Sequence, residues 1–330
     1  MKNVTKTNVL FAVTVLVYII LTHGIGLLYS APWFPKYIVS FNFLLILPEL
    51  ILLTPAIFYV AVVKKEPVES YGVSKVSMGT NIATVFMAFC IIPLVSLINM
   101  LSSFFVDNYV DNTLTTIVNE NSVIINLIII ALIPAIVEEF IFRGVIFNSY
   151  KKRNPFGAVL LSAFLFGLVH MNVNQFSYAF VIGVIFALLT YATGSIIPSI
   201  IAHFVINGNS VVMSHLLTYI QKGTQAVTET GSAMTPVDKL NEEYGMLSEA
   251  VVYAVVIGTL VVMSIIGCLV AFFIFRYICK KNRGIESVKM IFKKNVRNTY
   301  VEEEGKFFDE YLWLGIGVCL VYIILYDFIL

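Results

Sequence analysis

The stretch VEEFIFRG, Val137–Gly144, carries two adjacent glutamates and an arginine inside a run of apolar residues. VIINLIIIALIPAIV occupies positions 123–137, and VIF follows the stretch. A membrane-spanning helix needs about 20 mainly apolar residues. A charge in the bilayer costs roughly 3 kcal/mol on insertion scales, so an ionisable residue there is by default a functional hypothesis. The stretch therefore predicts a transmembrane helix that carries a functional site.

The composition extends this prediction to the whole chain. Of 330 residues, 59% are hydrophobic and 12% are charged, and the mean hydropathy is +0.90. Soluble domains are about a quarter charged. We therefore expect an all-α, polytopic transmembrane helical bundle, with the lipid bilayer as a partner and no nucleic acid. The four cysteines show no CxxC or paired spacing, which predicts neither a disulfide nor a cysteine-based zinc cluster.

Apolar runs predict about eight or nine transmembrane helices. They lie near residues 7–30, 37–63, 79–105, 123–150, 155–171, 175–192, 195–219, 249–278 and 311–330. The fifth and sixth are short. We divide the chain into N-terminal helices (1–119), a catalytic core (120–219), an external polar loop (220–248), and C-terminal helices joined by a basic linker (249–330).

Charge between the helices predicts their orientation. Lysine and arginine collect near the N-terminus, at 64–65, at 151–153 and over 276–297. Alternating helix directions place all of these on one face, and the lysine-free loop at 107–121 on the other. By the positive-inside rule the N-terminus is cytoplasmic, and nine helices leave the C-terminus outside. We expect an integral protein of a bacterial plasma membrane.

Four polar residues on three helices are predicted to share one depth. Counted from the basic turn at 151–153, Glu138 lies about 18 Å and His170 about 22 Å into the membrane, at 1.5 Å per residue. Counted from the next turn on that face, His203 lies about 12 Å and Asn207 about 18 Å deep. This convergence predicts one polar site near mid-membrane.

The two glutamates have different surroundings in the sequence. Glu139 and Arg143 are at i, i+4 and can pair directly, which is as consistent with a structural ion pair as with a catalytic one. Glu138 points about 100° away, and its own i+4 neighbour is Phe142, so it has no partner on its helix. A carboxylate removed from water without a paired cation suits a general base. We take Glu49 as a cap or a snorkelling residue, and His23 and His215 as structural.

Two chemistries fit a glutamate, two histidines and an asparagine in a dry cavity. The carboxylate can deprotonate a water while histidine and asparagine stabilise an oxyanion. Alternatively, Glu138, His170 and His203 can bind a zinc ion that activates the water. The chain has no HExxH, GxSxG, GxGD or P-loop motif, which argues against other intramembrane proteases and an ATP-driven transporter.

Three motifs together resemble one family, the CAAX-prenyl-protease and bacteriocin-processing (CPBP, or Abi) proteins, also called type II CAAX endopeptidase-like intramembrane proteases. The motifs are EExxxR (Glu138, Glu139, Arg143), FxxxH (Phe166, His170) and HxxxN (His203, Asn207). EExxxR alone would be weak, whereas the ordered set is specific. The resemblance covers about residues 120–215.

The resemblance implies an intramembrane endopeptidase whose site opens toward the cytoplasmic half of the membrane. By that similarity Glu138 activates the water, His170 helps to hold it, and His203 and Asn207 stabilise the oxyanion. Glu139, Arg143 and Phe166 would be supporting residues. The family is described both as metalloproteases and as metal-free glutamate proteases, and we favour the second. The expected substrate is a peptide or a membrane protein.

Two other readings remain. A proton-coupled transporter could use the same buried groups as a relay, but the chain shows no second copy of EExxxR or HxxxN, as an internal repeat would. A catalytically idle membrane scaffold could keep the fold without the reaction, although every motif position carries an active-type residue. Substitution of Glu138, His170 or His203 separates these readings from the peptidase.

Overall fold

A computed structural model describes residues 3–64, 68–106, 109–230, 246–292 and 306–329, and these are helical with short connections. The α-helices are α1 (Asn3–Ser30), α2 (Phe41–Phe58), α3 (Met78–Ser102), α4 (Tyr109–Glu120), α5 (Val123–Asn126), α6 (Ile133–Glu139), α7 (Asn148–Tyr150), α8 (Pro155–Leu168), α9 (Val173–Thr193), α10 (Ile197–Thr230), α12 (Met246–Lys281), α13 (Ile285–Lys289) and α15 (Glu310–Phe328). Short 3-10 turns are η1 (Lys36–Ile38), η3 (Val68–Tyr71) and η6 (Met290–Phe292), and π-helical segments are η2 (Tyr59–Lys64), η4 (Leu127–Leu132) and η5 (Phe140–Phe147).

Eight helices of the described chain are long and apolar enough to cross a membrane, and α8 is a shorter apolar helix. The all-α, polytopic fold predicted from composition is therefore confirmed. The most buried spans are 123–150 and 173–193, each with 44% of its most apolar stretch buried, against 11% for the span in α12. The helix that carries EExxxR is thus central, and α12 is peripheral.

Polar residues just outside the apolar runs begin the helices that surround the site. Asn154 accepts a hydrogen bond from Gly157 N at 3.0 Å, with Pro155 at the first position of α8. Asn172 accepts from Gln175 N at 2.8 Å to begin α9. Such caps satisfy backbone N–H groups that have no partner within the helix. The tight turns at both ends of α8 therefore follow from the local sequence.

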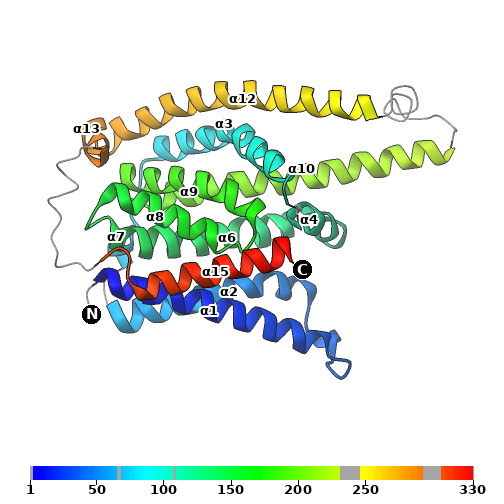
Figure 1. Cartoon of the computed structure of the whole chain (residues 1–330). Helices are drawn as coiled ribbons and strands as arrows, with labels where there is room; N and C mark the ends of the chain where they lie inside the picture. The colour runs from blue at the N-terminus through cyan, green and yellow to red at the C-terminus, as the bar shows by residue number, and fades with distance from the viewer. Residues whose placement is uncertain (1–2, 65–67, 107–108, 231–245, 293–305, 330) are drawn as a thin grey trace.

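Figure 1 shows the start of α1 at one end of the bundle, together with α7 and α13, and the end of α15 at the opposite end. The turns at the first end are tied together by hydrogen bonds: Ile196 N donates to Gly72 O at 2.9 Å, and Ser195 Oγ donates to Ser74 O at 2.6 Å. Most of the described basic residues in the connections between helices, among them Lys152 and Arg283, lie at this end, which we call the basic end; Lys36, between α1 and α2, lies at the other (Figure 1). This arrangement is the one that the alternation of charge predicts.

The span 123–150 is less regular than predicted. It alternates between α-helix and π-helix: Glu138 and Glu139 end α6, and the π-helical segment η5 carries Arg143. A π-helix accommodates an extra residue per turn and is frequent at functional sites. Depths counted at 1.5 Å per residue are therefore only approximate on this helix.

Two segments predicted as loops are helical where they are described. Residues 109–120 form α4, and α10 continues to Thr230, so that only 231–245 of the predicted external loop lie outside the described residues. In the basic linker, Val288 and Ile291 are buried against Ala192 and Cys279. Those two apolar side chains therefore pack on the bundle and not on a lipid surface.

Candidate active site

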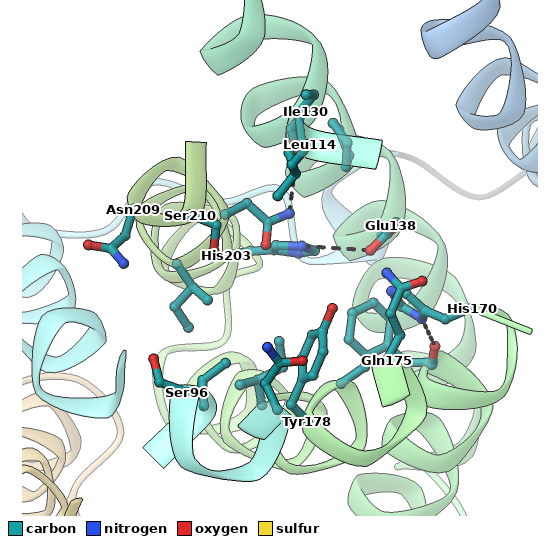
Figure 2. Close-up of a pocket in the computed structure, with 18 of the residues that line it drawn as sticks. Ser96, Leu114, Ile130, Glu138, His170, Gln175, Tyr178, His203, Asn209 and Ser210 are labelled. Atoms are coloured by element: carbon teal, nitrogen blue, oxygen red, sulfur yellow. Dashed lines mark hydrogen bonds and ion pairs between the residues drawn. The ribbon is translucent and has the colours of Figure 1, made fainter. Parts of the chain in front are cut away.

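The predicted site residues meet at one cavity of about 500 Å³ inside the bundle. Glu138, His170, His203 and Asn207 all line it, together with Phe166. They come from α6, the end of α8 and α10, as the depth argument predicts. Figure 2 shows Glu138 and His203 pointing toward one another across the cavity, with His170 beside them.

Glu139 and Arg143 lie behind the cavity wall and form a buried ion pair. Both side chains are fully buried, and Arg143 Nη1 donates to Glu139 Oε1 at 2.8 Å. Arg143 Nη2 also donates to the carbonyl of Gly183 on α9 at 3.0 Å. Two charges can remain in an apolar interior when they are paired and hydrogen-bonded in this way. This placement, behind the cavity and not in it, is what a supporting role for both residues would require.

His203 stands between the two glutamates. Its Nδ1 lies 3.2 Å from Glu139 Oε1, and its Nε2 lies 3.7 Å from Glu138 Oε2. The carboxylate of Glu139, ionised in its pair with Arg143, can only accept hydrogen bonds, so Nδ1 of His203 carries the proton and donates. Nε2 is thereby directed at Glu138 and the cavity.

The ring of His170 is oriented by its own helix end. Its Nδ1 lies 2.8 Å from the carbonyl oxygen of Phe166, which can only accept a hydrogen bond. The proton of His170 is therefore on Nδ1, and in the neutral ring Nε2 is an acceptor. A water in the cavity can donate to that nitrogen.

Aromatic rings position the charged groups. The guanidinium of Arg143 lies 4.3 Å from the ring centre of Phe166 and 5.3 Å from that of Phe186. Phe186 stacks on His203, and Phe166 meets His170 edge to face. Cations lie favourably over such ring faces. Phe166 thus contacts both the buried cation and a cavity histidine, which is a physical reason for the FxxxH spacing.

The asparagine of HxxxN lies one helical turn beyond His203. Asn207 Nδ2 is 3.5 Å from the carbonyl oxygen of Ile130, at the limit of a hydrogen bond. This long contact leaves the amide available to a ligand in the cavity.

Glu49 is a cavity residue that the sequence analysis missed. It was expected to cap or to snorkel, but it lines the same cavity as Glu138, and among the described residues its Oε2 is buried without a hydrogen-bond partner. Its place within the apolar run of α2 could have identified it as a candidate site residue, because an ionisable residue in a membrane span is by default a functional candidate. His215, also taken as structural, lies 3.1 Å from Asn126 Nδ2, in keeping with that role.

The geometry does not form a metal site from the residues proposed for zinc. Within the described ranges, no three His, Cys, Asp or Glu side chains come together in an arrangement that could hold a metal ion. A zinc site needs at least three protein ligands at about 2.0–2.3 Å. As they stand, Glu138, His170 and His203 do not meet this requirement, and we derive no step through a metal.

The arrangement has the parts of a water-activating site. One carboxylate and one imidazole nitrogen face the cavity, and a second imidazole offers an acceptor near them. An amide lies one turn away. A base within reach of a water, and donors for a developing negative charge, are what hydrolysis of an amide requires.

Comparison with known proteins agrees with this geometry. Residues 120–208 match the family model described as type II CAAX prenyl endopeptidase Rce1-like, and all seven motif residues lie within this range. An 88-residue segment is 36% identical to YdiL of Bacillus subtilis (strain 168), whose name presents it as a candidate membrane peptidase. The match covers 26% of this chain and 36% of that relative. No solved structure matches significantly.

Proposed function

We propose that this integral membrane protein is an intramembrane endopeptidase in which Glu138 activates the attacking water, a proposal supported by the match of residues 120–208 to the Rce1-like family model of type II CAAX prenyl endopeptidases. The observation that carries the proposal is the position of Glu138. It faces the cavity and His203, while its neighbour Glu139 is occupied by Arg143.

The reaction begins with a water between Glu138 and His170. Glu138 takes a proton from the water, and Nε2 of His170 accepts the second hydrogen in a hydrogen bond that orients it. The water oxygen bonds to the carbonyl carbon of the peptide, whose C=O bond pair moves onto oxygen. The proton on Glu138 then passes to the amide nitrogen, and the C–N bond breaks to release an acid and an amine.

The oxyanion formed in the first step needs donors. Asn207 supplies its amide N–H. His203 has its Nδ1–H on Glu139, so it donates from Nε2 only as the imidazolium. Arg143 in turn holds the Glu139 carboxylate in place through its hydrogen bond at 2.8 Å. The supporting pair therefore acts on the reaction through His203, by positioning its ring.

We propose a peptide or membrane-protein substrate. The purified protein in lipid bilayers is to be given a library of membrane-anchored peptides in ¹⁸O-labelled water, with product ends identified by mass spectrometry. One ¹⁸O in the new carboxylate of a product is the expected result. Cleavage that a zinc chelator stops and added zinc restores would replace the metal-free mechanism with a metal-dependent one. Peptide carried across the bilayer without cleavage would support the transporter reading instead.

A further inference from the structure

The cavity extends from the site toward one end of the bundle only. On four of the helices that line it, the lining residues begin at mid-helix, at the level of Glu138 and His203, and continue away from the basic end. They fall within 95–99 of α3, 130–138 of the EExxxR helix, 175–182 of α9 and 203–217 of α10. Glu138 and His203 are the lining residues of their helices nearest the basic end, so the catalytic groups form the floor of the cavity.

A second cavity leads in the same direction. It has a volume of about 570 Å³ and shares Tyr18, His170 and Gln175 with the first. Its other walls come from the second halves of α1 and α15, including His23 and Tyr322. Both helices run from the basic end to the opposite end. Both cavities that adjoin His170 therefore lie toward the end without the basic turns.

The wall above the floor combines polar and apolar side chains. Its polar part comes from Asn207, Asn209, Ser210 and Ser214 of α10 and from Ser96 of α3, and its apolar part includes Val95 and Met213. Amide and hydroxyl side chains both donate and accept hydrogen bonds, which matches the alternating N–H and C=O groups of an extended peptide backbone. Among the described residues, the carboxylates that line the cavity are Glu49 and Glu138. Figure 2 shows Ser96, Asn209 and Ser210 around the cavity.

We infer that substrate reaches Glu138 from the extracytoplasmic face, as an extended peptide segment lying against the polar wall of α10. The positive-inside rule assigns the basic end to the cytoplasm, and the cavities extend away from it. The substrate class is then an exported peptide, or the outer part of a membrane protein. The family resemblance implies the opposite side, so the two expectations can be told apart. The substrate class in this inference rests on the proposed function, whereas the side from which the cavity is reached does not.

Thiol labelling tests the side of access. In a background with Cys90, Cys268, Cys279 and Cys319 replaced by alanine, Ser210→Cys introduces a thiol into the polar wall. The matched control, Ser74→Cys, introduces one between η3 and α3 at the basic end, where Ser74 is exposed. A small, charged, membrane-impermeant thiol reagent is applied to sealed right-side-out and inside-out vesicles. Each change is made separately in the full-length protein that lacks the four native cysteines.

We expect the Ser210→Cys variant to be labelled only in right-side-out vesicles and the Ser74→Cys variant only in inside-out ones. Labelling of both from the same side would overturn the inference, and so would failure of the Ser210→Cys variant to react from either side. The same pattern is expected with Glu138→Gln added, because access does not need catalysis. If labelling follows the expectation but externally added peptides are never cut, the proposed peptidase fails while the access side stands.

Discussion

Glu139 Oε1 is the atom on which the buried charges converge. It accepts hydrogen bonds from Arg143 at 2.8 Å and from His203 at 3.2 Å, and all three side chains are at least 97% buried. Its partner Glu138 faces the cavity with a single contact at 3.7 Å. The two neighbouring glutamates thus have different environments, because the carboxylate of Glu139 pairs with Arg143 and that of Glu138 does not.

Replacing Glu139 by glutamine should destabilise the fold. The change leaves Arg143 buried without its counter-charge, and breaking a buried pair costs about 3–5 kcal/mol. Thermal unfolding of the purified protein in detergent measures the effect as a lowered midpoint. The matched control is Glu286→Gln, which removes the acid of an exposed pair with Lys289 at 2.7 Å. An exposed pair contributes about 0–1 kcal/mol, so equal shifts for the two variants would contradict the account.

Replacing Asn207 by alanine should slow cleavage without lowering the unfolding midpoint. Loss of one oxyanion donor typically costs about 10²–10³ in kcat, and the hydrogen bond that the Asn207 side chain makes within the described residues is the long contact to Ile130. Asn209→Ala is the comparison, since Asn209 lines the cavity two residues further along α10, in the wall proposed to hold the substrate. We expect this variant to raise KM and to leave kcat close to that of wild type. Steady-state kinetics on one cleaved peptide measure both constants, and similar losses of kcat in the two variants would contradict the oxyanion role of Asn207.

At the scale of elements, α1 and α15 pack through a glycine. A Cβ added at Gly315 would come within 2.7 Å of the Phe11 ring and 3.2 Å of the Ala12 backbone, whereas one added at Gly317 would meet nothing within 4 Å. Small residues at helix interfaces in membranes permit such close approach.

We therefore expect Gly315→Ala to lower the unfolding midpoint and Gly317→Ala to leave it unchanged or to raise it. Alanine is favoured over glycine within a helix by about 1 kcal/mol, so the steric clash must exceed this gain at Gly315. The two variants differ only in which face of α15 they alter. A Gly315→Ala protein as stable as the Gly317→Ala protein would show that α1 and α15 do not pack at this distance.

Helix existence and motif depth were predictable because both depend on apolar length and simple periodicity. The i, i+4 spacing of Glu139 and Arg143 correctly predicted their pairing. The π-helical segments η4 and η5 were not predictable, since no local residue pattern marks where an α-helix widens. For Glu49, the apolar run around it indicated a candidate functional residue, but nothing near it in the sequence indicates that α2 turns it toward the cavity of Glu138. The helix α4 was missed because its composition is polar.

At the scale of the whole molecule, the fold places the described ends of the chain on opposite faces. Asn3 lies at the basic end, and the last turn of α15 at the other (Figure 1). Eight candidate spans alone would return the chain to the face from which it starts, so this arrangement requires that the shorter helix α8 also crosses. The number of crossings therefore decides on which face the end of α15 emerges.

An alkaline phosphatase domain fused after α15 should be active in a bacterial host, because the enzyme folds only outside the cytoplasm. A fluorescent protein fused at the same place should be dark. Fusions within the turn at 151–153, at the basic end, provide the control and should give the reverse pattern. A phosphatase that is inactive after α15 would mean that α8 does not cross, and would reverse the direction assigned to α9 and α10.

The central claim is that Glu138 is the base, and the most direct measurement compares peptide cleavage by wild type, Glu138→Gln and Glu49→Gln in the same lipid. Both glutamates line the cavity, but only Glu138 contacts His203. We predict that Glu138→Gln lowers the rate by about 10²- to 10⁴-fold, as expected for loss of a general base, while Glu49→Gln retains far more activity. A Glu138→Gln protein that cleaves as fast as wild type, or no slower than Glu49→Gln, would contradict the account.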